Sequence, residues 1–167
     1  GYEKVEARTG RSRRAFDTTE VEKALTKLPG IAAAEARSIA AQGFATGDPK
    51  LPGFHFTRSD DLYYASFDGK NAVRLTKTAG EEEMPTFSPD GRFVAFVRSN
   101  DLFVVDVASA VERRLTEGGT EKKRNGKADW VYYEEIFNRD WQAFWWSPDS
   151  THIGFLQIDD APVKNHE

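Results

Sequence analysis

The sequence predicts a mainly β protein, a partial β-propeller of about two to three blades. An N-terminal helical segment precedes the blades, and a short helix is inserted between them. Two segments that each occur twice predict this fold, because a period near 40 residues with several short strands is typical of propeller blades. The unequal spacing of the two repeats predicts the insertion.

The start of the chain differs in character from the rest. Residues 1–16 are polar and basic, and we expect them to form a flexible lead-in. Helical patterns follow, and after the turn-forming segment at residues 46–53 short β-rich runs replace them. We therefore divide the chain into an N-terminal polar and helical segment, residues 1–50, and an incomplete propeller domain, residues 51–167.

Two helices are expected before the first strand. Thr19 followed three residues later by Glu22 is a capping-box pattern, which predicts a helix that ends at Pro29-Gly30. The alanine-rich segment 31–42 predicts a second helix, ended by Gly43. A partner-binding arm is one interpretation of this pair. Most amphipathic helices pack against their own domain, so we favour a packing element.

The longer repeat pairs residues 61–76 with residues 101–116, without gaps and at an offset of 40 residues. Both copies begin with Asp-Leu and end with Arg-Leu-Thr. Each copy contains short β-rich runs, as expected for neighbouring antiparallel strands. One such unit cannot bury both of its faces, so neighbouring units must stack.

The shorter repeat is a Ser-Pro-Asp turn followed by an apolar strand, at residues 87–97 and 146–156. Proline presets φ in such a turn, and glycine or serine closes it. Ser88 and Ser147 are 59 residues apart, which is 19 more than the offset of the longer repeat. The surplus lies between Thr116 and Trp146.

This surplus predicts an insertion at about residues 126–144, which holds two adjacent glutamates, Glu134 and Glu135. Insertions in repeat folds project from one face and often build the binding site. Aromatic residues recur here at helical spacing and predict a short helix with a buried aromatic stripe, from which the glutamates point away. The stripe consists of Trp130, Tyr133, Phe137, Trp141 and Phe144.

Adjacent carboxylates repel each other unless water or a cation screens them. A solvated helix face is the ordinary explanation of a Glu-Glu pair. Arg139 follows at a spacing that could pair it with Glu135. The flanking aromatics and the position in an insertion nevertheless favour an organic cation from outside as the partner of both carboxylates.

Composition excludes several classes of protein. A formal net charge of −4 with scattered basic residues argues against nucleic acid as a partner, and no segment is long and apolar enough to span a membrane. The chain has no cysteine, so we expect neither disulfides nor a thiolate metal site, and we expect no metal or cofactor. The absence of cysteine is compatible with a periplasmic or secreted bacterial protein. The start at Gly1 predicts a processed or truncated product.

The segment "DWVYYEEIF" and the later "WWSPDSTHIGFLQIDDAPV" resemble the dipeptidyl peptidase IV family, serine exopeptidases of the prolyl oligopeptidase clan. The resemblance covers about residues 54–163. It implies that Glu134 and Glu135 clamp the free amino terminus of a peptide substrate. It also implies that the helix supporting them contains Asp129, Trp130 and Tyr132. Tyr133 stands where the family has a further glutamate.

The resemblance implies a function for the whole chain. It would be the N-terminal propeller portion of an enzyme that releases X-Pro or X-Ala dipeptides from peptide amino termini. In the family, the nucleophile lies in a Gly-x-Ser-x-Gly elbow of a C-terminal α/β-hydrolase domain. That motif does not occur in these 167 residues, so we expect no catalytic residue in them and no activity from the chain alone.

The other chemistry-bearing residues match no motif. The three histidines, His55, His152 and His166, stand beside no convincing serine and aspartate set, so a catalytic triad is not expected. The family also places a propeller arginine near the substrate carbonyl. Arg58 and Arg98 are candidates by position, but neither matches well enough to take that role.

A non-catalytic periplasmic propeller scaffold that binds protein partners is the alternative function, because Ser-Pro-Asp-Gly repeats occur in propellers of many functions. The 19-residue surplus favours the peptidase, since a plain scaffold has no need of it. The expected partners are a peptide with a free amino terminus and the C-terminal hydrolase domain. Open sheet edges predict self-association into a homo-oligomer.

Overall fold

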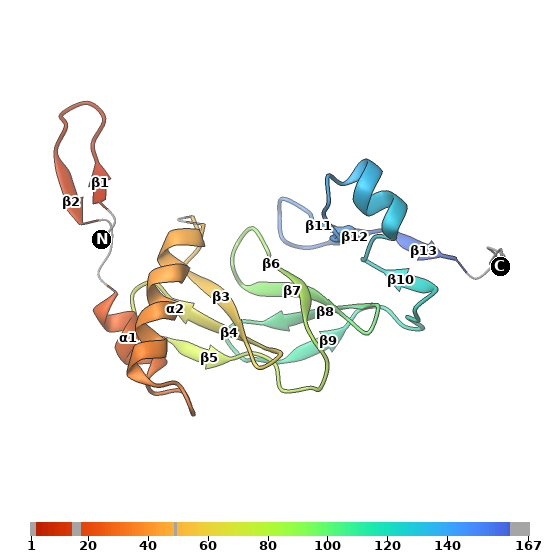
Figure 1. Cartoon of the computed structure of the whole chain (residues 1–167), viewed down its shortest axis with the longest axis horizontal. Coiled ribbons are helices and arrows are strands. Elements are labelled where there is room, and N and C mark those ends of the chain that lie inside the picture. The colour runs from red at the N-terminus through yellow and green to blue at the C-terminus, as the bar shows by residue number, and fades with distance from the viewer. Residues whose placement is uncertain (1–2, 15–17, 49, 161–167) are drawn as a thin grey trace. The chain divides into compact units, whose positions relative to one another are not determined.

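The computed structural model describes residues 3–14, 18–48 and 50–160 (Figure 1). These residues form antiparallel sheets, two α-helices and one π-helical turn. The chain divides into two compact units, Gly1–Arg58 with Tyr63–Arg74, and Ser59–Leu62 with Leu75–Glu167. The mainly β fold class is confirmed. The boundary between residues 50 and 51 stays a prediction, as does self-association through open edges.

A β-hairpin occupies most of the predicted lead-in. Strand β1 (Glu3–Val5) pairs with β2 (Ser12–Arg14). The Glu6 N–H donates to the Arg11 carbonyl at 2.9 Å, and Gly10 supplies a φ of 70° in the turn. The expectation of a flexible segment is therefore wrong for residues 3–14, and the rest of the lead-in lies outside the described residues.

Both predicted helices are present, with different ends. Helix α1 (Thr19–Leu25) has Thr18 rather than Thr19 as its N-cap, and the Thr18 hydroxyl donates to the Glu22 carboxylate at 2.6 Å. Helix α2 (Ala33–Thr46) continues past Gly43 and ends before Gly47. A Cβ at position 43 would lie 2.3 Å from the ring of Phe54, so glycine serves close packing there rather than helix termination.

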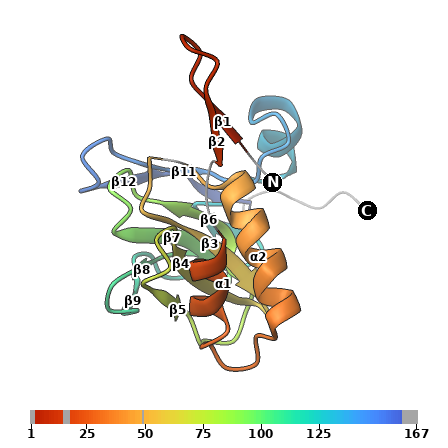
Figure 2. The same ribbon diagram turned by 90° about the vertical axis from the view of Figure 1, so that its left-hand side faces the viewer.

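The helices cover one face of the first sheet, in which β3 (Gly53–Arg58), β4 (Asp61–Ser66) and β5 (Ala72–Arg74) lie in that order (Figure 2). Buried apolar side chains of the helices and strands form one core. The helices therefore pack against their own sheet, as the favoured interpretation predicts. The members of this core are Val21, Leu25, Ile31, Ala36, Ala40, Phe54 and Ala65.

The second sheet is four-stranded, with β6 (Glu83–Phe87), β7 (Phe93–Arg98), β8 (Asp101–Asp106) and β9 (Glu112–Arg114) in chain order. We call this sheet the complete blade.

The 40-residue repeat has the same hydrogen bonds in both copies. The Leu102 N–H donates to the Thr116 hydroxyl at 2.9 Å, and the Leu62 N–H donates to the Thr76 hydroxyl at 2.8 Å. In each copy the threonine of the Arg-Leu-Thr segment thus accepts a hydrogen bond from the strand that begins with Asp-Leu. The repeat identified in the sequence is therefore a structural repeat.

The two Ser-Pro-Asp turns also have equivalent hydrogen bonds. The Ser88 hydroxyl donates to Asp90 at 2.7 Å and accepts from the Phe93 N–H at 3.0 Å. Ser147 donates to Asp149 at 2.5 Å and accepts from the His152 N–H at 2.9 Å. These internal bonds fix the turn before the strand that follows it.

A third copy of this turn was missed in the sequence. Ser66 donates to Asp68 at 2.7 Å and accepts from the Asn71 N–H at 2.9 Å, with Gly69 at a φ of 68°. Hydrogen bonds from Lys70 and Ser66 lower the pKa of Asp68 to about 2. The shared Ser-x-Asp pattern, without the proline, could have identified it.

The second Ser-Pro-Asp turn joins β11 (Phe144–Trp146) to β12 (Ile153–Phe155). Trp146 pairs with Ile153, as Phe87 pairs with Val94 at the same place in the complete blade. The hairpin therefore corresponds to the first two strands of another blade. Beside it, β10 (Lys123–Asn125) pairs with β13 (Gln157–Asp159).

A largely buried ion cluster links β7 to β9 in the complete blade. Arg98 donates to Glu82 at 3.2 Å and to both carboxylate oxygens of Glu112. Burial raises the pKa of Glu82, against the lowering effects of Thr76 and Arg98. One oxygen of Glu82 has no hydrogen-bond partner in the described part of the chain. Arg98 therefore acts as an internal structural cation.

Candidate functional site

The predicted insertion lies between β10 and β11, and a short antiparallel stem joins its two ends. The Ala128 N–H donates to the Trp141 carbonyl at 2.9 Å, and the Ala143 N–H donates to the Gly126 carbonyl at 3.0 Å. Below the stem, Phe144 is fully buried in an apolar cluster of the same unit. Residues 129–140 thus form a projecting loop with fixed ends, which Figure 1 shows as the blue helical turn between β10 and β11.

The projecting loop contains the predicted short helix, as a single π-helical turn, η1 (Tyr132–Ile136). The Asp129 carboxylate accepts from the Tyr132 N–H at 2.8 Å, so this residue supports the start of the turn. The Phe137 N–H donates to the Tyr132 carbonyl at 2.8 Å, five residues back. Single π-helical turns are rare and often occur at functional sites.

The π-helical geometry reduces the difference in direction between two adjacent side chains. A helix bonded from i to i+5 takes more residues per turn than an α-helix, so consecutive side chains differ less in direction. Glu134 and Glu135 lie in the middle of η1. Neither is fully buried, and both belong to the projecting loop. The arrangement suits a cation that contacts both carboxylates at once.

The two carboxylates differ in their present contacts. Glu134 is 23 % exposed at its side chain and accepts from Nε of Arg139 at 3.2 Å. Glu135 is exposed and has no ion-pair partner among the residues that the structure describes. The sequence interpretation had allowed Arg139 to pair with Glu135, and that detail is wrong. The turn at the end of η1 directs the arginine to Glu134.

Aromatic rings surround the turn, but they do not form the buried stripe that the spacing predicted. Tyr133 stacks on Trp141 with ring centroids 4.1 Å apart, and Trp130 lies 5.7 Å from Tyr133. Trp130 is nevertheless 63 % exposed, and Trp141 is also exposed. The stem holds these residues at the surface, where helical spacing alone would have placed them inside.

A second set of ring contacts holds the other side of the turn. Tyr132 lies 5.6 Å from Phe137, and Phe137 meets the edge of Trp145 at 5.8 Å. Ile136, between them in the chain, stays exposed. Of the predicted supporting residues, Tyr132 therefore belongs to the turn itself, and Asp129 accepts a hydrogen bond at its start.

The arginines considered from the sequence lie in ion pairs elsewhere. Arg98 belongs to the buried cluster of the complete blade. Arg58 donates to Glu35 at 2.7 Å and to the Gly30 carbonyl at 2.7 Å, and the hydrogen bond to the Glu35 carboxylate raises the pKa of Arg58. Neither contact involves the projecting loop.

Of the histidines, two are described. Burial lowers the pKa of His55, and Nδ1 of His152 lies 2.7 Å from the Thr151 hydroxyl. His166 lies outside the described residues. The hydrogen bond of His152 Nδ1 is therefore to the hydroxyl of its chain neighbour and not to a carboxylate.

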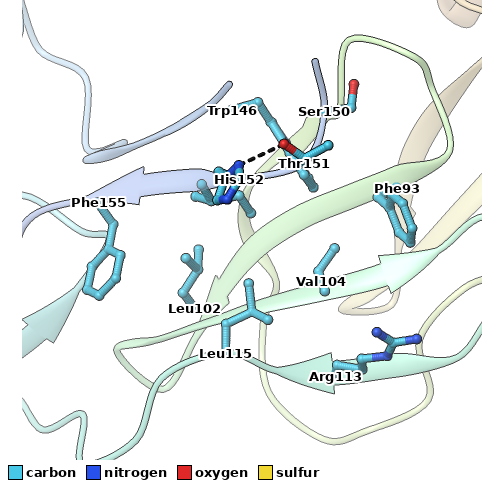
Figure 3. A pocket seen from close by; sticks show the side chains of 11 residues that line it. Phe93, Leu102, Val104, Arg113, Leu115, Trp146, Ser150, Thr151, His152 and Phe155 are labelled. Carbon is cyan, nitrogen blue, oxygen red and sulfur yellow. Dashed lines mark hydrogen bonds between the residues drawn. The ribbon is translucent and has the colours of Figure 1, made fainter. Parts of the chain in front are cut away.

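An apolar cavity of about 390 Å³ lies between the complete blade and the β11–β12 hairpin (Figure 3). Phe93, Leu102 and Leu115 line its blade side, and Trp146, Ile153 and Phe155 line its hairpin side. Arg113, Ser150, Thr151 and His152 add polar groups, but no carboxylate of the described residues lines it. The cavity is therefore suited to apolar packing and not to binding an ammonium group.

Neither a metal site nor a membrane-spanning helix is found in the described part of the chain. No group of three or more His, Asp or Glu side chains there is arranged to hold a metal ion. No helix among the described residues is both long and apolar enough to cross a membrane.

Comparison with known families gives one match that covers most of the chain. Residues 49–167 match the family model described as the dipeptidyl peptidase IV N-terminal region. Dipeptidyl peptidase 4 of Felis catus is 35 % identical over 109 residues, which are 65 % of this chain and 14 % of the relative. Dipeptidyl aminopeptidase A of Saccharomyces cerevisiae is 40 % identical over 79 residues, 47 % of this chain and 8 % of the relative.

A solved structure supports the same fold. The crystal structure of Porphyromonas gingivalis dipeptidyl peptidase 4 matches with a TM-score of 0.56 and 31 % identity, over 67 % of this chain and 16 % of that one. The likeness agrees with the predicted partial propeller. The chain thus spans a small part of the length of each of these relatives.

Proposed function

Because the chain belongs to the dipeptidyl peptidase IV family, through the N-terminal region of that family, we propose that it binds the amino terminus of a peptide for a serine dipeptidyl peptidase. The parent enzyme would release X-Pro or X-Ala dipeptides. One observation carries this proposal. Glu134 and Glu135 lie together on a π-helical turn that a stem holds out from the blade.

The chemistry of the two carboxylates fits a peptide amino terminus. An α-amino group has a pKa of about 7.7–8, so it is largely an ammonium near neutral pH. An ammonium offers three N–H donors, and bonds between such donors and carboxylates are short and strong. Two carboxylates that accept from one ammonium fix its position. The distance from that position to the nucleophile would then limit the released product to two residues.

The chemical step belongs, in this proposal, to a C-terminal α/β-hydrolase domain of the parent chain. The sequence has no Gly-x-Ser-x-Gly motif, and it corresponds to 14 % of the feline relative. We expect the purified 167-residue chain to show no turnover of a Gly-Pro chromogenic substrate. Clear turnover by this chain would contradict the assignment of catalysis to another domain.

Binding is tested on the 167-residue chain by an NMR titration with the tripeptide Gly-Pro-Ala and with its N-acetylated form. The free amine should shift backbone signals of residues 130–139, and the acetylated peptide, which has no ammonium, should not. Glu135→Gln should weaken binding and so reduce the shifts at a given peptide concentration, whereas the matched control Glu121→Gln, at an exposed site outside η1, should leave them unchanged. Equal shifts with both peptides would contradict the proposal.

A further inference from the structure

Of the carboxylates of Glu134 and Glu135, only that of Glu134 forms an ion pair with Arg139. Nε of Arg139 donates to Glu134 at 3.2 Å, and the arginine side chain is 73 % exposed. Glu135, one residue away, has no such partner among the described residues. One member of the pair is therefore already neutralised while the other is open.

The backbone places Arg139 beside Glu134 by an uncommon route. Asn138 has a φ of 50° and Arg139 a φ of 65°, so two successive residues with side chains adopt the left-handed conformation. Such residues adopt this region rarely and at a cost. The Arg139 N–H donates to the Tyr133 carbonyl at 2.8 Å, which fixes the reversal. The chain thus turns back and brings the guanidinium to a carboxylate five residues earlier.

We propose that Arg139 is an internal counter-ion, which occupies Glu134 in the empty site and which the ammonium of an arriving peptide displaces. This inference rests on the proposed function. The Nε–H of Arg139 and an arriving ammonium are both cationic donors to the Glu134 carboxylate, and two cations beside one carboxylate repel each other, so they compete for it. Glu135 is open and makes the first contact with the peptide. Arg139 then turns into solvent, which its exposure permits.

Competition of this kind lowers the affinity of the site for an amino terminus. The binding free energy of the peptide includes the cost of breaking the ion pair that it replaces. Exposed ion pairs contribute little, and their usual strength corresponds to a factor of about two to five in an equilibrium constant. Removing the arginine should therefore tighten binding by about two- to fivefold.

The variant Arg139→Gln tests this inference in the same titration. Gly-Pro-Ala should bind about two- to fivefold more tightly than to the wild type. Arg37→Gln is the matched control, because Arg37 lies 3.6 Å from Glu22 with exposures of 76 % and 23 %, close to those of the Arg139 pair. That control should bind as the wild type does. Arg139→Lys keeps the positive charge and should stay close to the wild type.

The Nε–H signal of Arg139 gives a second reading that a merely structural role would not move. In the wild type it should shift when Gly-Pro-Ala binds and stay in place with the N-acetylated peptide. Equal or weaker binding by Arg139→Gln, with an unmoved Nε–H signal, would overturn the counter-ion alone. If the wild type does not distinguish the two peptides, both the counter-ion and the proposed function fail.

Discussion

The complete blade and the projecting loop use the same backbone feature for different purposes. In the blade, Ser99 and Asn100 both have positive φ and connect β7 to β8, as a two-residue hairpin requires. In the loop, Asn138 and Arg139 have positive φ at the end of η1, where no hairpin needs them. The first pair completes a sheet, and the second pair positions a charged side chain.

The two regions also treat apolar residues differently. The blade buries its apolar side chains, and Val94, Phe96 and Val97 have no exposed surface. The loop leaves Trp130 and Ile136 more than half exposed. Packing explains the choice of residues in the blade and does not explain it in the loop. The comparison teaches that the blade has the buried packing of a stable core, whereas the loop keeps apolar side chains at the surface, as the proposed binding role requires.

The largest effect is expected in the blade. Phe96→Ala would leave a cavity beside Phe103, whose ring stacks on Phe96 with centroids 5.6 Å apart. The free energy of unfolding should fall by about 3–5 kcal/mol. Trp130→Ala, at an exposed aromatic of the loop, should change it by about 0.5 kcal/mol or less. Denaturant titration measures both, and equal losses would erase the distinction between the regions.

The second effect concerns binding alone. Glu134→Gln or Glu135→Gln removes a charged acceptor, and each should weaken binding of a free peptide amino terminus by about 1.5–3 kcal/mol. The free energy of unfolding should stay within about 0.5 kcal/mol of the wild type, because neither side chain is buried. Calorimetric titration and denaturant unfolding measure the two quantities. A large loss of stability with unchanged affinity would show that the loop is structural.

The third effect appears in acid. Hydrogen bonds from Ser147 and Thr151 lower the pKa of Asp149 from 3.8 to about 2. A carboxyl with a lowered folded pKa stabilises the fold above its unfolded pKa, and that contribution is lost as the pH falls toward 2. Asp149→Asn should therefore be less stable than the wild type at pH about 7, with a gap that narrows below pH about 4. A constant gap between thermal midpoints would contradict this.

The smallest effect is expected from relieving the left-handed backbone of the loop. Arg139→Gly removes a side chain that disfavours positive φ, but glycine loses more conformational entropy on folding. The free energy of unfolding should rise by at most about 1 kcal/mol. Ala95→Gly in β7, where φ is not positive, should instead lower it by about 0.5–1 kcal/mol. A loss of stability in Arg139→Gly as large as that in Ala95→Gly would show that the loop conformation is unstrained.

The blade could be predicted from the sequence because its signals are local. A Ser-Pro-Asp turn bonds within itself, so Ser88 and Ser147 identify the same structure wherever they occur. The 40-residue offset follows from strands that must pair in a constant register. The position of Glu134 and Glu135 in an insertion also followed from the repeat, since a surplus can be located once the period is known.

The remaining features depend on contacts that the sequence does not display. Gly43 has the pattern of a helix end, but its closeness to Phe54 explains it. Strand β1 has no alternation of apolar residues that would indicate a strand. The pairing of Arg139 with Glu134 depends on a π-helical turn followed by a left-handed reversal, for which an α-helical spacing gives no signal.

The most direct measurement of the central claim is a crystal structure of the chain with the tripeptide Gly-Pro-Ala. The peptide nitrogen should lie about 2.7–3.2 Å from a carboxylate oxygen of Glu134 and of Glu135. Arg139 should then be turned away from Glu134. A peptide seated in the apolar cavity of Figure 3, with both glutamates in water, would contradict the account.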